Sequence, residues 1–186
     1  MKAFASVTAT LLAGLLATGG AWARSTDVIN PELPRSLPAD GPVAVQWTDP
    51  AQFSEIRYSA NRREARRGEW VQDLAEYLRR RATARLPQGD RLEVTITDIE
   101  RAGDYEPWRG MQFDSIRYMR DVYPPRITLD FRLVGADGSV RAQGSRKLMD
   151  MSYLQRSTPL GNTDPLRYEK RLIDDWLRDE LGKPTA

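Results

Sequence analysis

Residues 127–144 read ITLDFRLVGADGSVRAQG, and this stretch decides the fold class. Apolar residues alternate with mostly polar ones along its first half, at Ile127, Leu129, Phe131 and Leu133. That period of two is typical of a strand with one face in a core and the other in water. Gly135-Ala136-Asp137-Gly138 then interrupts, and alternation resumes at Val140. The stretch predicts a β-hairpin with a four-residue loop.

Two further strands and a helix are predicted upstream of the hairpin. Residues 43–47 alternate until Asp49-Pro50 stops them, and residues 92–97 alternate in the same way. Between them, the residues from Asn61 to Leu86 change to a helical period, with an apolar face that includes Trp70, Leu74 and Leu78. Leu86-Pro87-Gln88-Gly89 ends this helix. A strand, helix and strand in this order predict a parallel crossover.

A second helix is predicted at the end of the chain, with Asp164 as N-cap and Pro165 in the first helical position. Its apolar stripe consists of Leu166, Leu172, Ile173, Trp176, Leu177 and Leu181, and Gly182 and Pro184 stop it. The predicted class is therefore α+β: a four-stranded mixed sheet whose one face is covered by two helices, in the order β-α-β-long loop-β-β-α.

The N-terminus has the pattern of a secretory signal peptide. Lys2 precedes a small and apolar run from Ala3 to Ala17, and the cleavage motif is Ala21-Trp22-Ala23. A membrane anchor is the alternative, but the run is shorter than the roughly 20 residues that cross a bilayer. The chain has no cysteine to carry a lipid anchor. We expect a signal peptide (1–23), an extended proline-rich leader (24–42), one domain (43–182), a tail (183–186) and a soluble periplasmic product that is not a lipoprotein.

The composition excludes many kinds of chemistry. The chain has no histidine and no cysteine, which removes the commonest general base, thiol catalysis and the usual zinc sites. No phosphate-binding glycine loop is present, so we expect no nucleotide cofactor, and no other cofactor or metal is indicated. The mature chain would carry 27 basic and 26 acidic side chains, a near neutrality that does not favour nucleic acid as a partner.

The long connection from Glu100 to Pro125 is the unusual segment, because compact domains rarely have such connections without a function. The residues we select as a candidate recognition surface are Tyr105, Trp108, Arg109, Phe113, Arg117 and Tyr118. These aromatic side chains would line a groove for a glycan, peptide or lipid headgroup, with an arginine binding an anion. Alternatively, they fold back and cover the second face of the sheet. We expect the cover, because a bare apolar face would promote aggregation.

The motifs around this connection resemble those of the DUF3016 family of exported proteobacterial proteins. The stretches that carry the resemblance are Leu86-Pro87-x-Gly89, Asp98 to Gly103, Glu106-Pro107-Trp108, Asp121 to Arg126, and Asp164 to Lys170, with Asp174 and Trp176 beyond. The resemblance covers the chain from about Val43 to Glu180. It implies export and a single domain, and it assigns no activity, substrate or site residue.

Two clusters of charge leave functional alternatives open. The carboxylates considered for a glycan hydrolase are Asp98, Glu100, Asp104, Glu106 and Asp121. The nearby arginines favour ion pairing for them, and the spacing of a calcium loop is absent. Residues 57–85 hold nine arginines and four acids, a stripe that would meet anionic lipid or lipopolysaccharide or would simply be solvated. We expect the solvated face, balanced by the acidic final helix.

Together these patterns predict a non-enzymatic exported protein of the cell envelope that binds a periplasmic partner or an anionic envelope component through the connection. The alternative is a carboxylate-dependent hydrolase of envelope glycans.

The signal peptide gives the first testable prediction. Cleavage after Ala23 would make Arg24 the mature N-terminus, because small residues occupy the two recognition positions before it. N-terminal sequencing of protein recovered from the periplasmic fraction checks this, and a product that begins at Met1 would contradict it.

Overall fold

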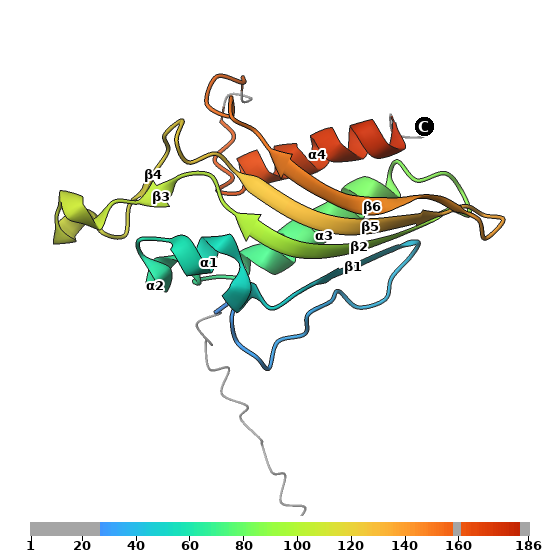
Figure 1. Cartoon of the computed structure of the whole chain (residues 1–186), viewed down its shortest axis with the longest axis horizontal. Coiled ribbons are helices and arrows are strands. Elements are labelled where there is room, and N and C mark those ends of the chain that lie inside the picture. The colour runs from blue at the N-terminus through green and yellow to red at the C-terminus, as the bar shows by residue number, and fades with distance from the viewer. Residues whose placement is uncertain (1–26, 158–160, 183–186) are drawn as a thin grey trace, which may run out of the picture.

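The chain forms a four-stranded sheet with helices on one face, as seen in a computed structural model (Figure 1) that describes residues 27–157 and 161–182. The strands are β1 (Val43–Trp47), β2 (Arg91–Glu100), β3 (Asp104–Tyr105), β4 (Arg117–Tyr118), β5 (Arg126–Val134) and β6 (Val140–Met149). The helices are α1 (Ser54–Tyr58), α2 (Arg62–Ala65), α3 (Trp70–Thr83) and α4 (Arg167–Leu181), with short 3-10 helices η1 (Pro50–Gln52), η2 (Pro107–Arg109) and η3 (Met111–Phe113). The predicted signal peptide and C-terminal tail lie outside the described residues.

The main sheet has the order β1-β2-β5-β6 and is mixed, which confirms the predicted α+β class. β1 and β2 are parallel, so the segment between them crosses over the sheet, as predicted. β5 and β6 form the predicted hairpin, with a loop one residue longer than expected. Its Gly138 has a φ of 82°, a left-handed conformation in which glycine avoids the Cβ clash.

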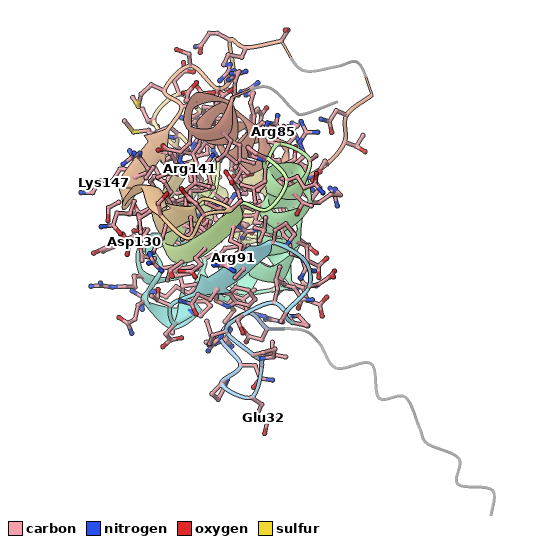
Figure 2. All side chains as sticks on the ribbon, turned by 90° about the vertical axis from the view of Figure 1, so that its right-hand side faces the viewer. Glu32, Arg85, Arg91, Asp130, Arg141 and Lys147 are labelled. Carbon is pink, nitrogen blue, oxygen red and sulfur yellow. The ribbon has the colours of Figure 1, made fainter. Side chains whose placement is uncertain are left out.

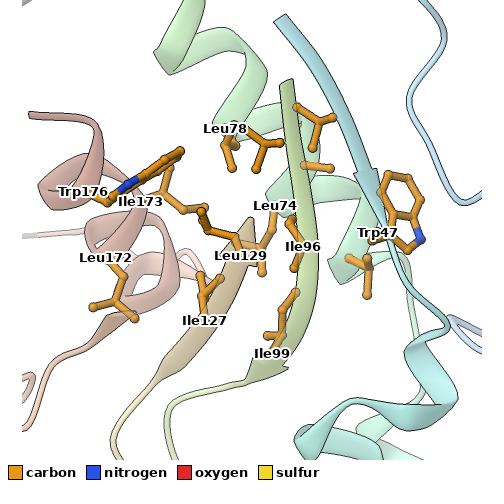
Figure 3. Close-up of a cluster of buried hydrophobic side chains, with 14 of the residues drawn as sticks. Trp47, Leu74, Leu78, Ile96, Ile99, Ile127, Leu129, Leu172, Ile173 and Trp176 are labelled. Carbon is orange, nitrogen blue, oxygen red and sulfur yellow. The ribbon is translucent and has the colours of Figure 1, made fainter. Parts of the chain in front are cut away.

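One face of the sheet is covered by α3 and α4, which pack against each other and against the strands (Figures 1 and 3). The core residues labelled in Figure 3 are Trp47, Leu74, Leu78, Ile96, Ile99, Ile127, Leu129, Leu172, Ile173 and Trp176. The Trp176 ring meets the Phe131 ring edge-on at 5.7 Å between centroids, so α4 is fixed to the middle of β5. The final helix thus docks through the stripe that the sequence indicates.

The opposite face of the sheet is polar and open, so the expectation that the aromatic connection covers it is wrong. Asp130 and Lys147 lie on this face in Figure 2, away from the helices, and Gln46 donates a hydrogen bond to Thr95 there. A polar face does not need an apolar cover. Trp108, which such a cover would bury beneath the sheet, is 69% exposed.

The predicted leader is part of the fold from Asp27 onward. The backbone N–H of Leu37 donates to Val45, and that of Trp47 donates to Arg35, so the leader follows the free edge of β1. Val28 and Leu37 are buried in the main core. This pairing covers an otherwise bare strand edge, which is a common protection against aggregation.

The first predicted helix is interrupted. Gly68 has a φ of 90° between α2 and α3, and this left-handed residue breaks the helical path that the apolar period predicts from Asn61. The last helix also begins later than predicted, at Arg167 instead of Pro165. Asp164 is not its N-cap: its carboxylate accepts the N–H of Leu166 and pairs with Lys170. Both helices still present the predicted apolar faces to the sheet.

The docking of α4 predicts a large loss of stability for Trp176→Ala. The indole is 4% exposed, so its removal leaves a cavity and should lower the free energy of unfolding by about 3–5 kcal/mol. Chemical denaturation measures the change. Val140→Ala, at an exposed position of β6, is the control and should stay within about 0.5 kcal/mol of the parent. An unchanged midpoint for Trp176→Ala would show that α4 does not dock through this residue.

Candidate functional site

The connection between β2 and β5 projects from one end of the sheet as an arm (residues 101–125), visible at the left of Figure 1. β3 and β4 pair antiparallel along the arm, and η2 and η3 form its outer end, which we call the arm tip (residues 107–116). Gly103 permits the close approach of the two strands, since a Cβ there would lie 2.7 Å from the Tyr118 carbonyl oxygen. The arm is therefore a paired structure and not a loose loop.

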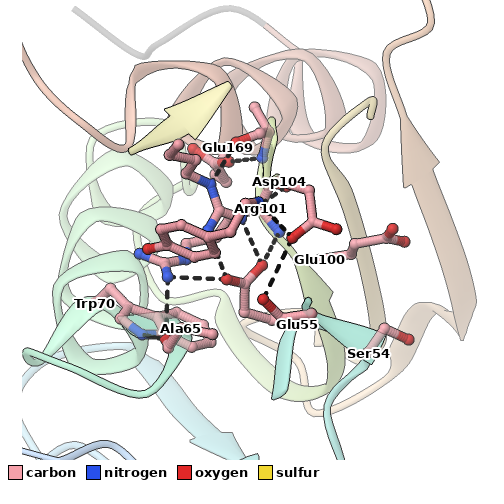
Figure 4. Close-up of polar contacts among 12 residues, drawn as sticks. Ser54, Glu55, Ala65, Trp70, Glu100, Arg101, Asp104 and Glu169 are labelled. Carbon is pink, nitrogen blue, oxygen red and sulfur yellow. Dashed lines mark hydrogen bonds and ion pairs between the residues drawn. The ribbon is translucent and has the colours of Figure 1, made fainter. Parts of the chain in front are cut away.

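A buried ion cluster holds the root of the arm (Figure 4). Glu55 in α1 has a side chain 2% exposed, and Arg117 donates to both of its carboxylate oxygens at 2.8 Å. Arg101 donates to the same carboxylate twice, from its side chain at 2.9 Å and from its backbone N–H at 3.0 Å. Burial alone would raise the pKa of Glu55, but the two guanidinium groups outweigh it and hold the pKa below 4.5.

The two arginines of this cluster also stack on aromatic rings. The guanidinium of Arg101 lies 4.6 Å from the Trp70 ring centre, and that of Arg117 lies 5.1 Å from the Tyr105 ring centre. Arg117 donates further hydrogen bonds to the carbonyl oxygens of Arg101 and Ala102. The cluster thus joins α1, the start of α3 and both strands of the arm.

α1 is oriented for this role by Asp98. The register of β2 against β5 shifts between Ile96 and Asp98, the mark of a β-bulge, which re-aims side chains. The Asp98 carboxylate accepts hydrogen bonds from the backbone N–H and the hydroxyl of Ser54, at 2.6 and 2.7 Å. Ser54 is the first residue of α1, so these bonds position the following Glu55.

A second buried carboxylate connects the arm to α4. Glu169 is fully buried, and its Oε1 accepts the backbone N–H of Ala102 at 2.6 Å, while its Oε2 has no hydrogen-bond partner among the described residues. Burial raises the pKa of Glu169 above its ordinary value. This contact ties the root of the arm to the last helix.

A third carboxylate, Glu106, stabilises the middle of the arm. Its side chain is 1% exposed and contacts Arg109, Arg120 and the hydroxyl of Tyr123. Burial would raise the pKa of Glu106, but these partners lower it below the ordinary value. A general acid of a glycosidase needs a raised pKa, so Glu106 is poorly suited to that role.

The other acids considered for hydrolysis are also bound to donors. Asp98 binds Ser54, Glu100 pairs with Arg126, Asp104 accepts from the Ser59 hydroxyl and Asp121 accepts from the Gln155 amide. Within residues 27–157 and 161–182, no group of three or more carboxylates is arranged to hold a metal ion.

The arm tip presents large apolar side chains to solvent. Met111 is 88% exposed and Trp108 is 69% exposed, and the Ile116 and Phe113 side chains of the tip are also exposed. Val122 is exposed in the turn between β4 and β5. Exposed apolar residues that gather on one projection mark an interaction surface, whereas single ones are ordinary.

The structure divides the six candidate residues of the recognition surface into three groups. Tyr105 and Arg117 belong to the buried root. Arg109 stacks on the Tyr118 ring at 4.6 Å along the arm, and only Trp108 and Phe113 lie at the tip with exposed rings. No local pattern in the sequence reveals the exposure of Met111 and Ile116. Glu55 is not predicted either, because a single glutamate in a short segment resembles any surface acid.

A hollow of about 460 Å³ lies elsewhere, between the leader and the open face of the sheet. The side chains on its floor bind one another: Gln46 bonds to Thr95, and Glu93 pairs with Arg132. Because these groups satisfy each other, the hollow offers few free polar groups to orient a ligand.

Comparison with known protein families finds one match. A family model described as "Protein of unknown function (DUF3016)" matches residues 41–179. No curated protein and no solved structure matches the chain.

The Glu55 cluster predicts that Glu55→Gln loses stability. The change leaves two partly buried arginines without a counter-ion and should cost about 3–5 kcal/mol at pH 7. The parent should keep this contribution above pH 4.5, the ordinary glutamate value, and lose it as acid protonates Glu55 through its lowered pKa. The difference in the free energy of unfolding between the variant and the parent should therefore become smaller only in acid.

Urea denaturation at several pH values measures this difference. Glu64→Gln is the matched control, because Glu64 pairs with the exposed Arg67 and its loss should cost about 1 kcal/mol or less. Equal losses for the two variants would contradict a special role for the buried cluster.

Proposed function

We propose that this chain, which belongs to the DUF3016 family, is a non-enzymatic exported protein of the cell envelope. The family is described as one of unknown function, so it assigns no activity to the chain. In this proposal the arm binds a partner or an envelope component, and the tip makes the contact.

The observation that supports this role most strongly is an exposed apolar tip on a firmly held arm. Trp108 and Met111 are exposed, whereas the root carries the buried Glu55 and Glu169 contacts. A surface that is already ordered loses little conformational entropy on binding, which favours affinity. Tryptophan is also enriched among the residues that dominate binding energies.

The state of the acids favours binding over hydrolysis. Each acid considered for catalysis has a donor of its own, and Glu106 has a lowered pKa. The chain also lacks histidine and cysteine, the side chains that most often supply a base or a nucleophile.

Export is the part of the proposal that rests on the sequence. The N-terminal charge, apolar run and cleavage motif support it. Across the described ranges, no helix is long and apolar enough to cross a membrane.

The proposal predicts that Trp108→Ala separates binding from stability. An exposed indole contributes little to folding, so the free energy of unfolding should change by less than about 0.5 kcal/mol. A photoreactive amino acid in place of Met111 should cross-link an envelope component in cells, and Trp108→Ala should abolish that product.

The same photoreactive residue at Val140, which is exposed far along the chain on β6, is the control and should give no such product. A destabilisation near 3 kcal/mol would instead mean a buried indole. A stable variant that still cross-links would show that the tip is not the contact.

A further inference from the structure

The aromatic connection and the arginine stripe, which are separate in the sequence, meet at the arm tip. The Asn61 side-chain amide donates to the backbone carbonyl of Asp114 at 2.9 Å, and the Ser59 hydroxyl donates to Asp104 at 3.3 Å. Asn61 caps α2 and directly precedes two arginines of the stripe. The front of the stripe is thereby fixed beside the apolar tip.

Three arginines of this region are exposed and available. Arg57, Arg62 and Arg63 have no carboxylate within ion-pair distance among the described residues, and Arg62 donates only to the Arg57 carbonyl. Farther along the stripe, Arg66 and Arg67 already pair with Asp27 and Glu64. At the far end of the stripe, Arg79 donates to the Pro38 carbonyl and Arg80 lies over the Tyr77 ring, away from the arm. Beside the arm, the positive charge without a carboxylate partner is that of Arg57, Arg62 and Arg63.

The arginines and the apolar tip are close in sequence to the contact between Asn61 and Asp114. Arg62 and Arg63 are one and two residues from Asn61, and Phe113 is one residue from Asp114, at about 3.8 Å per residue. Asp114 is the exposed acid of the tip, while the buried Glu106 is shared by Arg109 and Arg120. The balance of charge around the apolar side chains is positive.

We propose that the arm tip and these three arginines form a peripheral docking surface for an anionic phospholipid bilayer. The inference rests on the proposed function and names the envelope component. For the part of the arginine stripe beside the arm, this inference replaces the expectation that the arginines are only solvated. The interfacial layer of the bilayer takes up the apolar side chains of the tip, which are Trp108, Met111, Phe113 and Ile116. The lipid phosphates are contacted by Arg57, Arg62 and Arg63.

The chemistry of a bilayer surface matches this arrangement. Phosphate groups lie outside an apolar layer, and here the arginines flank a short apolar projection. Tryptophan favours the membrane interface, and each basic residue near an anionic surface adds roughly 1 kcal/mol of attraction. A protein groove would also accept an apolar projection, but it gives no reason for unpaired arginines beside it. Such docking is reversible, because it buries only a few side chains.

The test is sedimentation of the purified protein with vesicles of phosphatidylcholine alone or with 30% phosphatidylglycerol, at about 50 mM salt. We expect binding only to the anionic vesicles, with a blue shift of Trp108 emission, since the other described tryptophans are already buried. Arg62→Gln with Arg63→Gln should weaken partitioning about 25-fold, and Trp108→Ala about tenfold. Arg62→Lys with Arg63→Lys should retain most of the binding.

Arg66→Gln with Arg67→Gln is the matched control, because it changes the net charge equally at two arginines that already have partners. If this control loses as much binding to anionic vesicles as Arg62→Gln with Arg63→Gln, only the net charge of the protein matters, and the inference is overturned. Equal binding to both kinds of vesicle, or to neither, would overturn it as well.

The photoreactive residue at position 111 distinguishes this inference from the proposed function. A cross-link to lipid that Trp108→Ala abolishes supports both. A Trp108-dependent cross-link to a protein, without vesicle binding, leaves the proposed function standing and rejects the bilayer. The absence of any cross-link rejects the proposed function itself.

Discussion

The buried carboxylate of Glu55 is the constraint on which the arrangement of the arm depends. An isolated charge at 2% exposure would be very costly, so the fold must supply compensating charge at that point. It does so with Arg101, where the arm leaves β2, and Arg117, where the arm returns. Both arginines reach one carboxylate only when the two strands of the arm lie side by side against α1. The ion cluster thus couples a local helix to a segment about sixty residues away in sequence, and the pairing of β3 with β4 follows from the same geometry.

Three buried glutamates show how the number of arginine partners decides the charge state. Glu55 and Glu106 each contact two arginines, and their pKa values are lowered despite burial. Glu169 is buried just as completely, but its contact is one backbone N–H of Ala102, and its pKa is raised. The first two are therefore charged supports of the arm. Glu169 more readily accepts a proton, which suits a side chain that closes the interface between the arm and α4. Between the equally buried Glu55 and Glu169, the difference in pKa arises from their partners and not from the depth of burial.

The exposed tip is held in a defined position because the root of the arm is fixed to the helices. The polar open face of the sheet needs no cover, so folding does not require the aromatic side chains of the connection to turn inward. Trp108 and Met111 project on a segment whose base is held by α1, α3 and α4. The exposed arginines of α1 and α2 lie beside them because Asn61 binds the backbone of the arm. An apolar projection, a rigid base and a cationic flank together constitute a surface suited to binding.

The sequence by itself determined the class of the fold, the hairpin of β5 and β6, the parallel crossover and the apolar faces of α3 and α4. Each of these depends on a period of two or 3.6 residues that one segment shows alone. The break at Gly68, the late start of α4 and the pairing of the leader with β1 depend on tertiary contacts or on a single left-handed residue. The direction of the arm was decided only in three dimensions. Local sequence gives Glu55, Arg101 and Arg117 no mark that separates them from surface charges, and burial is a property of what packs around a residue. For the same reason, the sequence alone does not show that Trp108, a residue type typical of protein cores, is exposed in the structure.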